Sequence, residues 1–201
     1  MLGLTLIRLH GLSLATSTEW LDNLDQGAIS NLTFQAMSAA LSVSNEKPWS
    51  ATLPKGVKGS EIATMFRVWA ASLPLFVWAT TQQIRTWFCI DAPRSGSELV
   101  ISRIKKLLDD PGDPCVWPRG KCLEPVLVAL LYCIEACALK NTWRPWILQT
   151  LRRVARLLNL EGPEGFKKTL EFFPSTEGHR MVASGVWAEI AYDMIHVTDA
   201  F

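Results

Sequence analysis

Residues 123–139 read LEPVLVALLYCIEACAL, an apolar run in which Glu124 and Glu135 are the only charged side chains. A helix that is apolar on every side is normally buried on every side, because none of its faces gains from contact with water. Pro125 falls in the first turn of such a helix, where its missing N–H removes no hydrogen bond. The stretch therefore predicts a central buried helix, and Glu135 within it argues against a membrane span.

Seven further segments around this run show apolar residues at helical spacing or helix start signals, and breaks rich in proline and glycine separate most of them. They span residues 17–24, 28–43, 62–89, 98–109, 143–158, 164–173 and 178 onward. No segment alternates apolar and polar residues for long enough to indicate a strand. The sequence thus predicts an all-α fold, a compact single domain of about eight helices with a buried central helix.

Two of these segments carry more detailed predictions. Pro74 lies inside residues 62–89, and proline removes one backbone donor and crowds the preceding turn. We expect either a kink there or two consecutive helices. In the last segment, helical spacing predicts the following inward-facing residues: Met181, Val182, Val186, Ile190 and Met194.

The first residues of the chain set the domain division. Residues 1–14 are apolar but include Arg8 and His10, and they lack the basic start and the small-residue cleavage site of a signal peptide. We therefore divide the chain into an N-terminal arm or helix remnant over residues 1–16 and one helical domain over residues 17–201.

The composition favours a well-packed domain. Of the 201 residues, 49% are hydrophobic and 19% are charged, and the formal net charge is +1. This hydrophobicity excludes general disorder, and the small net charge excludes a global field that would attract nucleic acid or anionic lipid. The nine tryptophans are expected mostly to wedge helices together, although Trp also suits interfaces and ligand pockets.

The cysteines and histidines give little sign of metal or catalytic chemistry. Five cysteines at uneven spacing, with no Cys-x-x-Cys pair, indicate a reducing intracellular compartment and small buried side chains. None of the three histidines is linked by spacing to a nucleophile, and no phosphate-binding glycine loop is present. The sequence therefore predicts neither a catalytic site nor a bound metal or cofactor.

Glu135 is the most informative polar residue, because a carboxylate inside an apolar helix needs a partner or a raised pKa. A functional acid, a ligand anchor and a structural ion pair with a neighbouring Arg or Lys all stay open, and the ion pair is favoured. Arg152, Arg153 and Arg156 follow on a later helix, where a solvated outer face or pairing with Glu135 or Glu161 is expected.

The order of features over residues 98–193 is more specific than any one of them. An amphipathic helix and a proline-rich break lead to PVLVALLYCIEA at residues 125–136, then to WRPWI at residues 143–147 and an arginine-rich helix. Val186-Trp187 follows near Asp193. This order resembles the C-terminal part of the regulatory domain of fungal zinc-cluster (binuclear Zn/Cys6) transcription factors, over roughly half of the chain.

The resemblance rests on packing motifs and has departures. Glu135-Ala136, Arg144 and Val186-Trp187 match the family's order, whereas Glu124-Pro125 stands where the family has Trp-Pro and Tyr132-Cys133 where it has Ala-Gly. The resemblance implies a helical domain that modulates transcription in the nucleus. The chain has no Cys-x-x-Cys-x6-Cys cluster, so direct DNA binding by this chain alone is not expected.

On this basis we expect a regulatory domain linked to fungal secondary metabolism, with an apolar small-molecule effector and a protein partner or a second copy as its contacts. The expected pocket lies between residues 123–139 and 62–89. Its candidate ligand-binding residues are Trp69, Trp78, Trp87, Tyr132, Glu135 and Arg144. The alternatives are an enzyme or accessory protein of a fungal biosynthetic pathway on the same fold, placed in the cytoplasm, and a degenerate fragment without activity.

Overall fold

The computed structural model describes residues 2–17, 25–45, 59–87, 97–109, 123–137 and 141–198. Within these ranges the fold is all-α, and no residue forms a strand. The helices are α1 (Leu2–Leu14), α3 (Gln26–Asn45), α4 (Gly59–Trp87), α5 (Ser97–Leu108), α6 (Glu124–Ala136), α7 (Arg144–Leu157), α8 (Pro163–Leu170) and α9 (Glu177–Thr198). The predicted fold class is confirmed, and the helix expected over residues 17–24 lies mostly outside the described residues.

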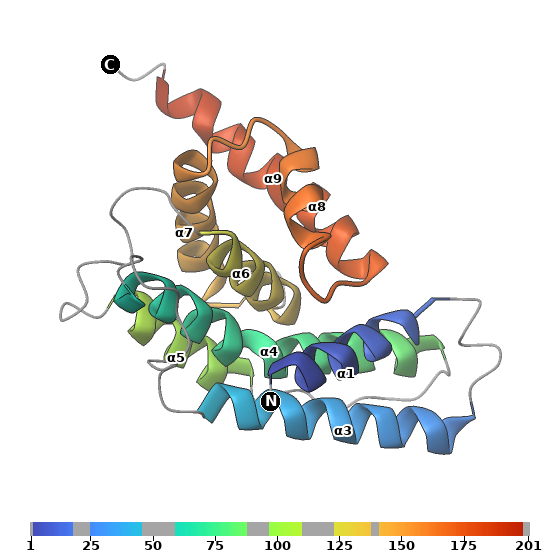
Figure 1. Cartoon of the computed structure of the whole chain (residues 1–201). Coiled ribbons are helices and arrows are strands. Elements are labelled where there is room, and N and C mark those ends of the chain that lie inside the picture. The colour runs from blue at the N-terminus through green and yellow to red at the C-terminus, as the bar shows by residue number, and fades with distance from the viewer. Residues whose placement is uncertain are drawn as a thin grey trace.

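The helices form two groups that meet where α4 packs against α6 (Figure 1). α1, α3 and α5 surround α4 in one group, whereas α7, α8 and α9 pack around α6 in the other. One continuous set of buried apolar side chains runs through both groups. The contact between α4 and α6 therefore joins the two halves of a single core.

The helix α6 is the centre of this core, as the sequence predicted. Eleven of its thirteen residues are buried, and the two exceptions are Glu124 and Glu135. Its proline lies at the start, where no backbone donor is lost. Among the described residues, no helix combines the length and the apolar character that crossing a membrane requires.

Pro74 does not divide its segment, because α4 continues without a break from Gly59 to Trp87. Pro74 supplies no N–H for the preceding turn. The carbonyl that loses its helical donor is that of Ala70, and in the same turn the Ser72 hydroxyl donates to the neighbouring Trp69 carbonyl oxygen at 2.6 Å. Of the two arrangements that the sequence left open, two consecutive helices are excluded.

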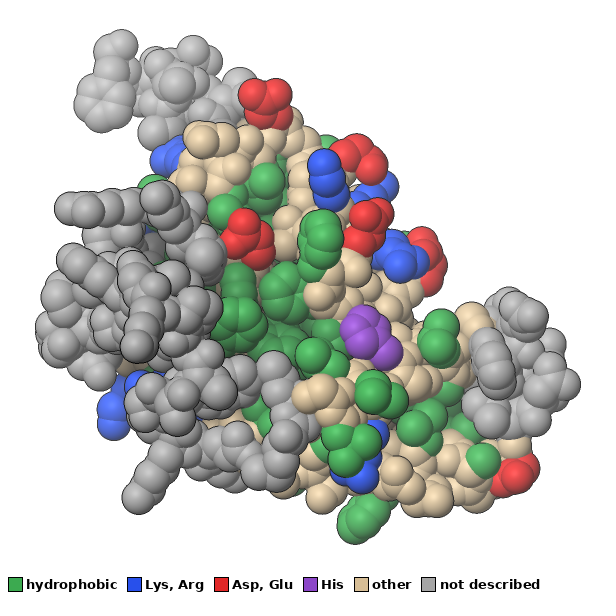
Figure 2. Space-filling model, in the orientation of Figure 1, with side chains coloured by type: hydrophobic (Ala, Val, Ile, Leu, Met, Phe, Trp, Pro, Cys, Tyr) green, Lys and Arg blue, Asp and Glu red, His purple; other side chains and the backbone are tan. Residues whose placement is uncertain are grey.

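The N-terminal residues form a helix that belongs to the core. Leu9 and Leu12 of α1 are fully buried, and α1 packs mainly against α3. Its other side exposes large apolar side chains, and α3 carries no charged residue. On the face in Figure 2, the surface over α1 and α3 is mostly hydrophobic or uncharged, whereas acidic and basic side chains gather over α8 and the start of α9. The expected protein partner or second copy stays a prediction.

The buried face of α9 differs from the one that the sequence predicted. Val186 and Ile190 are buried as expected, but Met181 is 70% exposed. His179 and Ala183 are buried together with Val186 and Ile190, and these four positions follow one helical stripe. The prediction was wrong for Met181 because apolar spacing alone did not include His179 in the buried stripe, whereas Val182 is half-buried and the side chain of Met194 lies outside the described residues.

Candidate functional site

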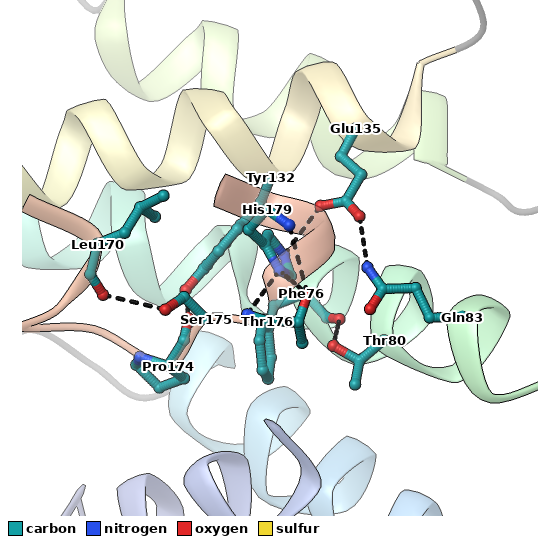
Figure 3. A network of polar contacts seen from close by, with 10 residues as sticks. All are labelled: Phe76, Thr80, Gln83, Tyr132, Glu135, Leu170, Pro174, Ser175, Thr176 and His179. Carbon is teal, nitrogen blue, oxygen red and sulfur yellow. Dashed lines mark hydrogen bonds and ion pairs between the residues drawn. The ribbon is translucent and has the colours of Figure 1, made fainter. Parts of the chain in front are cut away.

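A buried polar cluster connects α4, α6 and α9 around Glu135 (Figure 3). The Gln83 amide of α4 donates from Nε2 to Glu135 Oε1 at 2.9 Å. On the other side, His179 Nε2 of α9 lies 3.0 Å from Glu135 Oε2. The His179 side chain is fully buried and that of Glu135 is 13% exposed. The carboxylate therefore links three helices through contacts that are largely shielded from water.

The residue before α9, Thr176, orients the His179 ring. The Thr176 backbone N–H donates to His179 Nδ1 at 3.1 Å, and the Thr176 hydroxyl lies 2.6 Å from the same nitrogen. In return the His179 backbone N–H points to the Thr176 hydroxyl at 3.4 Å. This is the reciprocal arrangement of a capping box, with histidine in the place of the usual Glu or Gln. Thr176 thus fixes both the start of α9 and the direction of the imidazole.

This orientation also sets the tautomer of His179. A backbone N–H can only donate, so Nδ1 accepts and Nε2 carries the ring proton, directed toward the side of Glu135. Within the described part of the chain, however, neither His179 Nε2 nor Glu135 Oε2 has a hydrogen-bond partner in good alignment. The two groups are close enough to attract each other, but their hydrogen bond is not formed along its best direction.

Aromatic rings enclose the cluster. Phe76 of α4 stacks on the His179 ring at a centroid distance of 5.4 Å, and Tyr132 of α6 meets that ring edge-on at 5.1 Å. The Tyr132 hydroxyl donates to the backbone carbonyl of Pro174. Burial raises the pKa of Tyr132 far above its usual range, the Trp69 indole opposes this shift, and the Glu135 charge adds to it. The phenol therefore stays protonated and acts as a structural donor.

Gly178 has no side chain, and the Gln83 side chain occupies the space where a Cβ atom would lie. A Cβ atom at Gly178 would lie 2.2 Å from Gln83 Nε2, the atom that donates to Glu135. At Gly185, farther along α9, a Cβ atom would meet nothing within 4 Å. The two glycines therefore offer a matched comparison on one helix.

Gly178→Ala is expected to lower the free energy of unfolding by about 1 kcal/mol, because the Gln83 amide must leave Glu135. Gly185→Ala is expected to raise it by about 0.5–1 kcal/mol, since alanine loses less backbone entropy in a helix. Urea unfolding followed by circular dichroism measures both. Equal effects in the two variants would contradict the role given to Gly178.

The predicted ligand-binding residues separate in the structure. Tyr132 and Glu135 belong to the buried cluster (Figure 3). Trp69, which is 2% exposed, lies within hydrogen-bonding reach of Tyr132, and its ring is 5.7 Å from that of Phe173. Trp78 is half-buried on α4, and the side chain of Trp87 lies outside the described residues. Arg144 of α7 pairs with Glu189 of α9. Three of the six residues thus lie together, as core side chains.

The partners of Glu135 differ from those expected. They are Gln83 and His179, whereas the sequence favoured a neighbouring Arg or Lys. Neither Gln83 nor Thr176 was singled out from the sequence. The signal that would have found the second half of the cluster is the Thr176-x-x-His179 spacing at the start of an apolar helix, which resembles a capping box.

A cavity of about 480 Å³ opens beside this cluster, between the end of α1 and the segment that joins α8 to α9. Nine of its eleven lining residues carry polar side chains. Ser13, Thr16 and Ser17 lie on the α1 side, and Thr176 lies on the α9 side. Because Thr176 also holds His179, the wall of the cavity is in direct contact with the buried cluster.

Cys133 and Cys137 are free, buried thiols on the central helix and just after it. This confirms the expectation for these two, while Cys89, Cys115 and Cys122 lie outside the described residues. Burial raises the pKa of both thiols, to about 11 for Cys137, where Arg144 opposes the shift and Glu98 adds to it. Within the described ranges, no three His, Cys, Asp or Glu side chains gather to hold a metal ion.

Cys137 is expected to react about 100-fold more slowly with iodoacetamide at pH 8 in the folded protein than in urea. A thiol with a pKa of about 11 is ionised there to roughly one part in a thousand, against roughly one part in ten at the ordinary pKa of 9.0. The rate should rise about tenfold for each pH unit until the pH approaches 11. Fragment-ion mass spectrometry assigns the modified cysteine, and equal rates with and without urea would contradict the burial.

Comparisons of the chain with protein-family models, with curated proteins and with solved structures found no match. The resemblance to the fungal regulators therefore stays a prediction from the sequence. Any function has to be argued from the cavity, the buried cluster and the contact between them.

Proposed function

We propose that the chain is a ligand-responsive regulatory domain, in which a small molecule bound between α1 and α9 adjusts the packing of α4, α6 and α9. The observation that carries this proposal is the position of Thr176. It lines the cavity, and its backbone N–H and hydroxyl contact His179 of the buried cluster. A ligand that contacts the Thr176 hydroxyl competes for the same atom that orients His179.

The route from the cavity to the core is short. Thr176 contacts His179, His179 faces Glu135 on α6, and Glu135 accepts a hydrogen bond from Gln83 on α4. The poor alignment between His179 and Glu135 leaves room for a better-aligned arrangement. A ligand shifts such an equilibrium by the difference between its affinities for the two arrangements. The part of the fold that responds to the ligand is therefore the start of α9, which shifts relative to the packed pair of α4 and α6.

The biological setting of the proposal follows from the sequence resemblance. It is a fungal transcriptional regulator of secondary metabolism that acts in the nucleus and responds to a small-molecule effector. The buried central helix and the late Val186-Trp187, whose Trp ring packs edge-on against Phe166 at 5.5 Å, are packing features of the kind on which that resemblance rests. Regulation of a separate DNA-binding module fits a chain that has no zinc cluster of its own.

The alternative of a pathway enzyme has less support from the same residues. A general acid or base has to come within hydrogen-bond reach of its substrate. His179 is fully buried, the Tyr132 hydroxyl is bonded to Pro174, and Arg144 is paired with Glu189. These groups already form contacts that stabilise the fold, so we favour a regulatory function over a catalytic one.

A reporter assay tests the regulatory proposal. The full chain is fused to an unrelated DNA-binding module, and transcription is measured across a library of small metabolites in cells. We expect at least one compound to change the reporter output, and Thr176→Val, which keeps the shape but removes the hydroxyl, to abolish that change.

Thr169→Val is the matched control, because Thr169 is also buried and its hydroxyl donates to a backbone carbonyl within α8. This variant should respond to the compound as the unaltered chain does. A response that survives in Thr176→Val, or silence across the library together with turnover of a metabolite by the purified chain, would overturn the proposal.

A further inference from the structure

We infer that the cavity between α1 and α9 binds a small molecule that carries a protonated amino group beside a short apolar part. This inference rests on the proposed function and names the chemical class of its ligand. It depends on three properties of the cavity wall: the hydrogen-bonding capacity of its hydroxyls, its charge, and the position of its apolar side chains.

The hydroxyl groups of the wall offer acceptors, because their protons are already used. A Ser or Thr hydroxyl has one proton to donate and two lone pairs that accept. Four of the lining hydroxyls donate to backbone carbonyls within the protein. They are Ser13 to Leu9, Thr16 to Ser13, Ser17 to Leu14 and Ser175 to Leu170. The lone pairs that remain are best matched by a ligand with several N–H donors.

The charged groups of the wall also favour a cation. Glu171 and Glu177 supply two negative charges and Arg180 supplies one positive charge, which leaves one negative charge in excess when the imidazole of His10, which also lines the wall, is neutral. Arg180 donates to Glu177 at 2.9 Å, so these two largely neutralise each other. Within the described residues, the Glu171 carboxylate forms no salt bridge. Glu171 is therefore the acceptor that an ammonium group would meet.

The helix ends at the cavity agree with this polarity. The C-terminal end of α1, next to Ser13, Thr16 and Ser17, carries the partial negative charge of the helix and attracts cations. The N-terminal end of α9 is positive, but Glu177 lies in its first turn and offsets that charge. Of the two helix ends, the end of α1 is thus the more favourable for an ammonium group that also contacts Glu171 across the cavity.

Leu14 and Phe173 are the apolar members of the wall. Leu14 belongs to the end of α1 and Phe173 to the segment between α8 and α9, so each wall offers an apolar side chain to a short hydrocarbon chain. The face of a Phe ring also attracts a neighbouring cation. A polar acceptor set beside a small apolar surface fits a short alkylamine better than it fits a polyol or a carboxylate.

The test uses the full chain labelled with ¹⁵N and three probes of equal length: butylamine, butan-1-ol and butyrate. Protein-observed NMR reports which backbone amides shift during each titration. We expect butylamine to shift the amides of Thr16, Ser17 and Thr176 in a saturable manner, and butan-1-ol and butyrate to leave them unchanged at equal concentration. Glu171→Gln is expected to weaken butylamine binding about tenfold, because it removes a charged acceptor.

Glu164→Gln is the control for the loss of a surface charge, since Glu164 lies on α8, is highly exposed and is not part of the wall. Its dissociation constant for butylamine should equal that of the unaltered chain. Equal shifts with butan-1-ol, or an unchanged dissociation constant in Glu171→Gln, would overturn the amine assignment. If the reporter library then yields an effector without an amino group, the regulatory function stands without this ligand class. If no compound in either experiment acts on the chain, both fail.

Discussion

Replacing Phe76 with alanine is expected to lower the free energy of unfolding by about 3–5 kcal/mol, the range found when a buried aromatic ring is removed from a core. Phe76 is fully buried on α4, and its ring lies 5.3 Å from that of Tyr132 and 5.4 Å from that of His179. The variant loses the apolar contact between α4 and α6 and one wall of the polar cluster. A loss of this size is a large part of the stability of an ordinary domain.

Urea unfolding followed by far-ultraviolet circular dichroism measures this difference. Phe172→Ala is the matched control, because Phe172 is 75% exposed and the same atoms are removed from the surface. Its free energy of unfolding should change by less than about 0.5 kcal/mol. A loss below about 1 kcal/mol in Phe76→Ala would show that the contact between α4 and α6 is not the centre of the core.

The helices that could be predicted from the sequence are those whose burial follows from the local pattern. Residues 123–139 are apolar on every side, so no tertiary information was needed to place that segment at the centre. The same argument found α5 and α7, whose apolar and polar faces are distinct. It failed for Met181 on α9, where a polar residue occupies the buried stripe and the apolar pattern by itself indicates the wrong face.

The need for a partner at Glu135 could be predicted, but the partner could not. Burial of a carboxylate is a property of the helix that carries it, and α6 shows that property in its own sequence. Gln83 and His179 are 52 and 44 residues away along the chain, and only the packing of α4 and α9 against α6 brings them together. An Arg or Lys was expected as the partner because a buried carboxylate is most simply neutralised by an opposite charge, whereas the sequence does not show which side chains the packing brings near it.

The cavity was not predictable for a related reason. Its walls come from the end of α1 and the start of α9, and the residues there are serines, threonines and glutamates of the kind that end and begin helices everywhere. The tryptophans drew attention because large rings suit ligand pockets. In the structure Trp69 is instead packed between the rings of Phe66 and Phe173, which is the core role that the sequence also allowed.

The second large effect is expected at the pair Glu135 and His179. His179→Ala should lower the free energy of unfolding by about 3 kcal/mol, because it removes the buried ring that Phe76 and Tyr132 enclose and the imidazole nitrogen that lies 3.0 Å from a largely buried carboxylate. Glu135→Ala should lower it by about 2 kcal/mol, since the Gln83 amide loses its acceptor and His179 Nε2 loses the carboxylate oxygen that lies 3.0 Å away. The double variant should lose about 1–2 kcal/mol less than the sum of the single losses.

The difference between the sum and the double variant isolates the interaction itself. The exposed pair Glu177 and Arg180 on the same helix is the control, with its atoms 2.9 Å apart. Because water screens that pair, its own cycle should give a coupling below about 0.5 kcal/mol. A coupling as small for Glu135 and His179 would mean that their poor alignment removes most of the attraction between them. A movement of Thr176 would then not change the interaction energy between α9 and α6, and the regulatory proposal would lose its physical basis.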